Sequence, residues 1–132
     1  MNRLDSAAYM LRSDVVATVV GDGAVLLDLE SKFFFSVNQS GWAILQLFEV
    51  GCTPEEAMRQ ASALGAPRDD AASRAFVELL IREKIVTEIE SPGGAAEVNG
   101  PEVWAAPTLE KHREPLQRIM VSAFDPGLPL AE

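Results

Sequence analysis

Few residues of this chain have the side-chain chemistry that catalysis requires. Cysteine and histidine each occur once, as Cys52 and His112. A nucleophilic thiol needs a base beside it, and these two residues lie far apart in segments of different character. We therefore expect Cys52 to be a buried or half-buried thiol without a chemical role, and we expect no catalytic site.

The residues that could bind a metal ion or a phosphate have simpler interpretations. A zinc site needs three or four closely spaced ligands, which the sequence lacks. Asp69 and Asp70 are acids of the kind that begin a helix, where the helix dipole favours negative charge. Gly21 and Gly23 flank Asp22 in a hairpin-turn pattern rather than a phosphate-binding loop. We expect no metal, no cofactor and no enzymatic activity.

The composition narrows the class of partner. The chain has 132 residues, of which 48% are hydrophobic, and a formal net charge of −9. An acidic surface without a basic stripe repels phosphate backbones and anionic membranes, so we expect neither nucleic acid nor a membrane as a partner. No apolar run approaches the roughly 20 residues that span a bilayer, and the first ten residues lack a signal-peptide core, which predicts a cytoplasmic protein.

The first part of the chain predicts a three-stranded antiparallel meander. Residues 1–11 have the character of a loose N-terminal arm. The strands are then expected at Val15–Val20, at Ala24–Leu29 after hairpin residues, and at Lys32–Ser36 after a tight turn. Side chains alternate along a strand, so we expect Phe33 and Phe35 to face the helices and Phe34 to point away from them.

Three helices are expected after the meander. Asn38 is a strong helix N-cap, and the apolar residues behind it recur at helical spacing: Gly41, Trp42, Ile44, Leu45 and Phe48. Thr53-Pro54-Glu55-Glu56 begins a second helix, and Asp69-Asp70 begins a third that ends near Lys84. Ile85–Ile89 alternates like a closing strand. The sequence predicts an α+β domain, a meander followed by three helices in a winged-helix-like arrangement.

The composition changes after this domain. Ser91-Pro92-Gly93-Gly94 is typical of a linker, so we expect a folded domain over 12–90, a flexible linker over 91–101 and a C-terminal tail over 102–132. The tail contains Trp104 and Leu109, and solvated tails rarely carry such apolar anchors. We expect Thr108–His112 to begin a helix that leaves His112 in solvent.

The order of these signals resembles the PqqD-like family. The resemblance covers about residues 12–90 and is carried by the turn-rich hairpin, the aromatic strand, and four later patterns: Val37-Asn38 before Gly41-x-x-Ile44-Leu45, Thr53-Pro54-Glu55-Glu56, Asp70…Phe76…Leu80, and Ile85-Val86. Members are small peptide chaperones, or RiPP recognition elements, which bind the leader of a ribosomally made precursor peptide. The resemblance implies a precursor leader as partner, together with a modifying enzyme, either a radical SAM enzyme or a lasso-type protease or cyclase.

Proteins of this family bind the leader as an extra strand on the edge of the third strand, beside the third helix. Here this implies a peptide-binding site made by the following residues: Lys32, Phe33, Phe34, Phe35 and Ser36 on the strand, with Arg74, Val77 and Ile81 on the helix. The physical chemistry agrees, because the edge of a sheet offers unpaired N–H and C=O groups to an extended peptide.

The tail carries a second resemblance. Trp104-Ala105-Ala106-Pro107-Thr108-Leu109 is similar to the leader signature of lasso-type precursors: an aromatic residue, two spacers, proline, one spacer and leucine. Trp104 stands where tyrosine is usual, and Arg113 stands where a glycine would follow. With Trp104, Pro107 and Leu109 as anchors, the tail is a leader mimic, a degenerate fused precursor or a chance match, and docking in the strand-three groove of its own or a neighbouring chain stays open.

Three functional hypotheses follow from the sequence. The first is a non-catalytic chaperone that binds a leader by strand addition and presents it to a modifying enzyme. The second is a winged-helix regulator that binds DNA, which the acidic charge disfavours. The third is a self-associating scaffold, a homodimer in which the tail of one chain fills the groove of the next.

Overall fold

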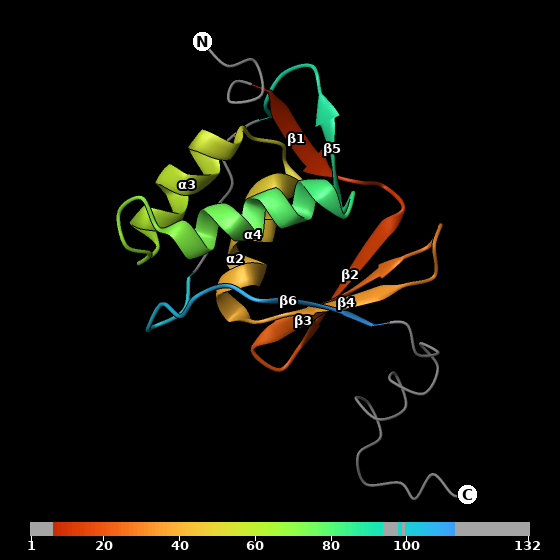
Figure 1. The fold of residues 1–132 in the computed structure, drawn as a ribbon, viewed down its shortest axis with the longest axis horizontal. Helices are drawn as coiled ribbons and strands as arrows, with labels where there is room; N and C mark the ends of the chain where they lie inside the picture. The colour runs from red at the N-terminus through yellow and green to blue at the C-terminus, as the bar shows by residue number, and fades with distance from the viewer. Residues whose placement is uncertain (1–6, 94–97, 99, 113–132) are drawn as a thin grey trace, which may run out of the picture.

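The computed structural model describes residues 7–93, 98 and 100–112 (Figure 1). Its elements are, in order, β1 Ala8–Leu11, β2 Val15–Val20, β3 Gly23–Asp28, β4 Phe34–Val37, α2 Gln39–Glu49, α3 Pro54–Ala63, α4 Ala71–Arg82, β5 Val86–Ile89 and β6 Leu109–His112. Within the described ranges, the strands form an antiparallel pair, β1-β5, and a four-stranded antiparallel sheet in the order β2-β3-β4-β6. The predicted α+β fold, a meander followed by three helices, is confirmed.

The helix boundaries follow the capping residues that the sequence indicated. Asn38 Oδ1 accepts a hydrogen bond from the Gly41 N–H at 2.9 Å and so caps α2. Thr53 Oγ1 accepts from the Glu56 N–H at 3.0 Å at the start of α3, with Pro54 in its first turn. Asp70 caps α4 in the same way. Each cap satisfies an amide group that the helix itself leaves unpaired.

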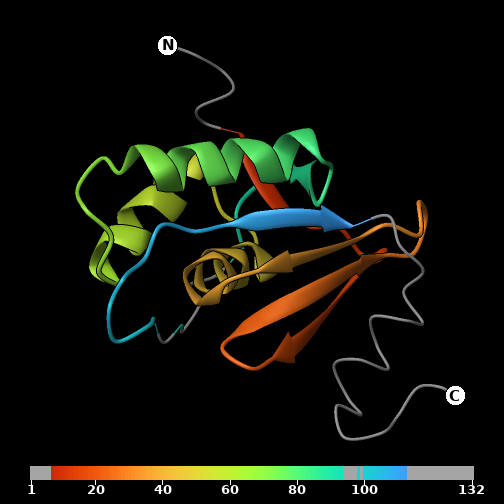
Figure 2. The same ribbon diagram turned by 60° about the horizontal axis from the view of Figure 1, so that its bottom comes forward.

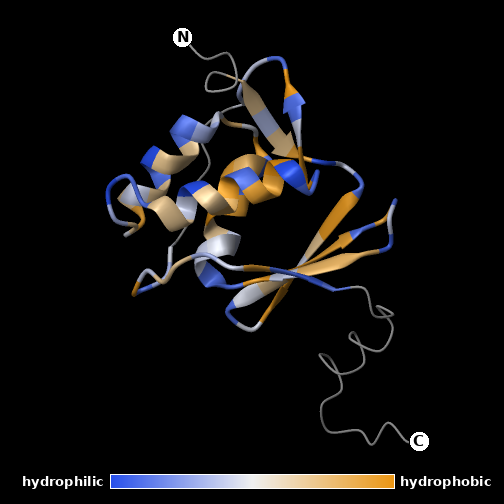
Figure 3. Cartoon of the chain, viewed as in Figure 1, coloured by the Kyte–Doolittle hydropathy of each residue, from blue (hydrophilic) through white to orange (hydrophobic). Residues whose placement is uncertain are grey.

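The core lies where α2 meets the four-stranded sheet and α4. Ile44, Leu45 and Phe48 of α2 are completely buried, as are Leu26 of β3 and Leu80 of α4. Figure 3 shows that α2 is the most hydrophobic helix and that α3 presents hydrophilic residues on the outside. Burial of a large apolar side chain stabilises a fold by about 1.5–3 kcal/mol, so these contacts fix the sheet against the helices.

Part of the expected N-terminal arm is a strand. Ala8–Leu11 pairs with Val86–Ile89, and Tyr9 exchanges two backbone hydrogen bonds with Cys52, at 2.8 and 3.0 Å. The prediction of a loose arm over 1–11 is therefore wrong for this segment, and residues 1–6 lie outside the described residues. The strand was missed because its partner comes more than seventy residues later in the chain, and pairing with it outweighs weak local signals.

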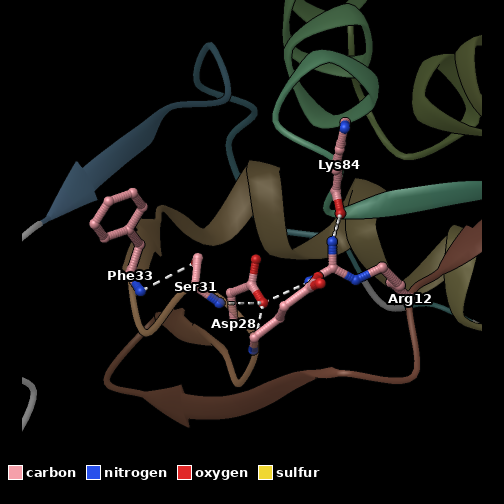
Figure 4. Close-up of polar contacts among 6 residues, drawn as sticks. Arg12, Asp28, Ser31, Phe33 and Lys84 are labelled. Atoms are coloured by element: carbon pink, nitrogen blue, oxygen red, sulfur yellow. Dashed lines mark hydrogen bonds and ion pairs between the residues drawn. The ribbon is translucent and has the colours of Figure 1, made fainter.

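The ion pair of Arg12 with Asp28 connects the sheet to the end of α4 (Figure 4). Arg12 donates to Asp28 Oδ1 at 2.5 Å and to the backbone carbonyl of Lys84 at 2.8 Å. The same Asp28 oxygen accepts from the N–H groups of Glu30 and Ser31, which shape the turn before β4. Burial alone would raise the pKa of Asp28, but the bonds from Arg12, Glu30 and Ser31 outweigh it and leave this pKa below its usual value. One carboxylate thus fixes the β3-β4 turn relative to α4.

Replacing Asp28 with Asn should destabilise the fold by about 3 kcal/mol, because it leaves the Arg12 guanidinium without its buried counter-charge. The pKa of Asp28 is lower in the folded than in the unfolded chain, so its contribution is complete above about pH 4 and is lost as the pH falls below that value. Urea unfolding at pH 7 and pH 3 should therefore show a smaller difference between Asp28→Asn and the natural chain at pH 3. Glu30→Gln is the control: Glu30 is exposed, lies 3.8 Å from Arg12, and should have little effect.

Candidate functional site

The edge of β4 is paired with a segment of the tail. β6 runs antiparallel to β4 in the register Val37↔Leu109, Ser36↔Glu110, Phe35↔Lys111 and Phe34↔His112. Figure 2 shows β6 lying alongside β4 with α4 above it. The docking edge expected from the sequence is therefore occupied in this structure by a tethered peptide of the same chain. The helix expected from Thr108 to His112 is wrong, because main-chain pairing with β4 makes Leu109–His112 a strand.

Two independent bonds show which backbone groups face which neighbour. The Phe33 carbonyl accepts from the Asp28 N–H at 2.9 Å, so the backbone N–H and C=O groups of Phe33 and of every second residue after it face β3. The backbone groups of Phe34 and Ser36 therefore face β6. On the tail, the Thr108 N–H donates to Asn38 Oδ1 at 3.1 Å, so the N–H groups of Glu110 and His112 also point toward the sheet. In the observed register, Phe34 is opposite His112 and Ser36 is opposite Glu110. The outward-facing backbone groups of β4 therefore face the inward-facing backbone groups of β6.

The tail is also bound before β6 begins. Asn38 Nδ2 donates to the Ala106 carbonyl at 2.8 Å, and the Ala105 N–H donates to Ser40 Oγ at 3.2 Å. Pro107 lies between the two residues that contact Asn38 and is buried. The entrance to α2 therefore continues the docking edge by means of side chains.

The three predicted anchors of the tail all contact the domain. Trp104 and Leu109 are half-buried against the main core, and Pro107 is buried. Gly65 lies beside the tryptophan: its φ of 123° favours glycine, and a Cβ there would lie 3.4 Å from the Trp104 Cβ, an ordinary van der Waals contact. The Trp104 indole N–H is buried and has no hydrogen-bond partner among the described residues. The pocket thus accepts the apolar ring, and no described residue pairs with its polar atom.

Polar contacts fix the other end of β6. Lys111 Nζ lies 3.0 Å from Glu83 Oε1 at the end of α4, and 4.8 Å from the centre of the Phe33 ring. On the opposite face, the His112 ring stacks on Phe34 with centroids 4.7 Å apart. His112 Nε2 lies 2.9 Å from Ser36 Oγ and 3.8 Å from Glu110 Oε1. The expectation that His112 lies in solvent is wrong, because stacking and pairing draw it onto the sheet.

The predicted strand residues fall into distinct places. Phe35 belongs to the core, Phe33 is half-buried against it, and Phe34 lies on the other face, as the alternation predicted. Phe34 is nevertheless 1% exposed, so it is not a free surface aromatic. Lys32 is not in the strand: its φ of 72° places it in the turn that β4 follows.

The predicted wall of α4 is only partly brought to the edge. Val77 is buried in the core and Ile81 is half-buried against it. Arg74 is exposed and lines a depression between α3 and α4 with Met58 and Arg68. The residues that line this depression include none of β6, so Arg74 is not brought to the docking edge.

The environment of Cys52 does not activate its thiol. Burial, with a smaller effect from Glu56, raises the pKa of the Cys52 thiol to about 12, so this thiol is protonated and unreactive at neutral pH. No group of three potential metal ligands occurs among the residues described, and no helix in these ranges is long and apolar enough to cross a bilayer.

Sequence reasoning missed several residues of this site, among them Asn38, Ser40, Glu83, Lys111 and His112. Asn38 was assigned only to helix capping, yet its carboxamide also contacts the tail on both sides of Pro107. Glu83 and His112 were not assigned to the edge at all. The only local signal was the position of Asn38, two residues after Ser36 and therefore in phase with the outward-facing groups of the strand.

The comparisons with known proteins give one solved structure similar to this chain: TbiB1 in complex with the TbiA(beta) leader peptide. It is 25% identical, with a TM-score of 0.52, and the similarity covers 62% of this chain and 99% of TbiB1. More than a third of this chain therefore lies outside the similarity. No protein-family model matches the chain, and no curated protein matches it.

Replacing Trp104 with Phe should leave the tail bound at least as well as in the natural chain, because it removes an unpaired buried N–H that costs about 1–3 kcal/mol. Trp104→Ala should speed hydrogen exchange of the tail amides several-fold, because the apolar contact between the tail and the core is lost. Hydrogen exchange of the Glu110 and His112 amides in the intact chain measures both effects. Equal loosening in the two variants would contradict this account of the pocket.

Proposed function

We propose that this chain is a non-catalytic peptide chaperone that binds the leader of a ribosomally synthesised precursor peptide as an additional strand on β4 and presents it to a separate modifying enzyme. The observation that carries the proposal is the pairing of β6 with β4: this edge accepts an extended peptide through its backbone. The similarity to TbiB1, which was solved with a leader peptide, supports the class of ligand.

The geometry of the edge suits peptide recognition. The main-chain groups of Phe34 and Ser36 supply affinity that does not depend on the peptide sequence. Selectivity comes from the contacts that flank these groups. They are the apolar contacts of Trp104 and Leu109 with the core and the ion pair between Lys111 and Glu83. The charge of −9 and the inert thiol support a binding role over DNA recognition or covalent catalysis.

In this proposal the tail is a leader-like ligand tethered to its own receptor. A ligand joined covalently to its receptor by a short tether has an effective concentration on the order of 1 mM. A segment with an intrinsic dissociation constant of about 0.1 mM would then keep the edge closed roughly ten to one, and an external leader would bind roughly tenfold more weakly than to an open edge. Such a tail lowers non-specific peptide binding without preventing the binding of a true leader.

Replacing Pro107 and Leu109 together with Ala in the intact chain should release the tail and open the edge, with little effect on the folding of residues 12–90. A synthetic peptide with the natural sequence of residues 101–112 should then bind this variant saturably, as measured by calorimetry. A scrambled peptide is the control. Failure of the natural peptide to bind, with the tail released and the fold intact, would exclude the proposed site.

N-methylated peptides test whether binding is strand addition. N-methylation at Glu110 removes an N–H that faces β4 and should abolish binding to the same variant. N-methylation at Lys111 alters an N–H that faces away and should cost much less. Equal loss for both peptides would argue against main-chain pairing as the mode of recognition.

Two further measurements separate the alternatives. Light scattering of the intact chain over a range of concentrations should show a monomer if the tail docks within its own chain, whereas a concentration-dependent dimer would indicate tail exchange. A mobility shift with random DNA at low salt should be blank. A salt-sensitive shift would instead favour a DNA-binding regulator.

A further inference from the structure

Asn38 occupies a special position on the docking edge. It follows Ser36 by two residues, so its backbone would supply the next outward-facing pair of groups on β4. The chain turns into α2 at this point, and the Asn38 carbonyl is taken by the Trp42 N–H at 2.9 Å. The backbone ladder therefore ends here, although the peptide beside it continues.

The side chain of Asn38 replaces the missing backbone groups. Oδ1 accepts from the Thr108 N–H at 3.1 Å, and Nδ2 donates to the Ala106 carbonyl at 2.8 Å. Oδ1 also accepts from the Gly41 N–H, which fixes the orientation of the carboxamide because only its oxygen can accept. The helix cap thus holds a peptide-like group in the position where the strand can no longer supply one.

The residue between the two contacts is proline. The described residues contain no cis peptide bond, so the peptide bond between Ala106 and Pro107 is trans. In a trans peptide the carbonyl points one way and the N–H of the next residue points the opposite way. An N–H at position 107 would therefore point away from Asn38, on the outer side of the edge strand. Residue 107 is buried, and a buried N–H needs a partner, whereas proline has no N–H to satisfy.

We propose that Asn38 is a specificity-determining residue of the peptide site. It selects peptides that have proline immediately before the residue opposite Asn38, as Pro107 precedes Thr108 in the tail. The selected pattern is Pro-x-Leu, with the leucine opposite Val37. This inference rests on the proposed function and goes beyond it, because it assigns the choice of proline to one side chain that also caps a helix.

The test compares four forms of the intact chain: natural, Asn38→Asp, Pro107→Ala and the double variant. Aspartate keeps an oxygen that caps α2 and replaces the donor to Ala106 with a charged acceptor, which repels the Ala106 carbonyl. Asp and Asn are about equal as N-caps. The readout is hydrogen exchange of the Glu110 and His112 amides, with the Ile44 and Leu45 amides of α2 as a measure of the fold. Asn38→Ser, which caps the helix with a shorter side chain, is a second variant.

We expect Pro107→Ala to speed exchange of the tail amides about tenfold when Asn38 is present and less than threefold when residue 38 is Asp or Ser. The α2 amides should not change. An equal effect of Pro107→Ala in all backgrounds would overturn the assignment to Asn38 while leaving strand addition intact. Tail amides without protection in the natural chain would instead overturn the strand addition itself.

The same selection should appear with a separate peptide. The Pro107→Ala, Leu109→Ala chain should bind the natural 101–112 peptide about tenfold more tightly than a peptide with alanine at position 107. Adding Asn38→Ser to that chain should reduce this preference to less than threefold. An unchanged preference would show that proline is selected by another part of the site.

Discussion

The structure depends on a short run of main-chain hydrogen-bonding groups at the edge of β4. Phe34 and Ser36 present N–H and C=O groups that β3 does not use, and an unsatisfied edge of this kind pairs readily with any extended chain. The paired strand is only four residues long, so its stability comes as much from its flanking contacts as from the ladder. In the proposed function, this combination lets the edge accept a peptide and still discriminate between peptides.

The rest of the fold keeps that edge in a fixed position relative to α4. Leu26 and Phe35 attach the sheet to the core beneath, and the Arg12–Asp28 pair connects the turn before β4 to the end of α4. Arg12 comes from the connection between β1 and β2, so the strand that was not expected at Ala8–Leu11 contributes to this support. A buried ion pair is a costly way to gain stability, but it fixes one geometry well.

The sequence predicted the elements whose signals are local. Asn38, Thr53 and Asp70 marked the three helix starts, because a capping side chain acts on amides only three residues away. The alternation of the phenylalanines correctly separated Phe35 from Phe34. The strands β1 and β6 were missed for one physical reason: each is short, has no strong propensity of its own, and is a strand only because a distant segment pairs with it.

The candidate site was predictable in its location and not in its details. A strand edge can be located from the meander, but the occupant of that edge depends on how a later segment folds back. Asn38 illustrates the limit. Its capping role follows from its neighbours, whereas its contacts with Ala106 and Thr108 need almost seventy residues of intervening chain to be placed first.

The dual role of Asn38 also bears on how the edge can change. A side chain that served only the peptide could rotate freely when the peptide leaves. Because Oδ1 also accepts from Gly41, the carboxamide stays oriented as long as α2 is folded. In the proposed function, the edge therefore loses little conformational entropy when a peptide binds, and the entropic cost of binding falls mainly on the peptide. A peptide with proline at the matching position is already restricted in φ, which lowers that remaining cost.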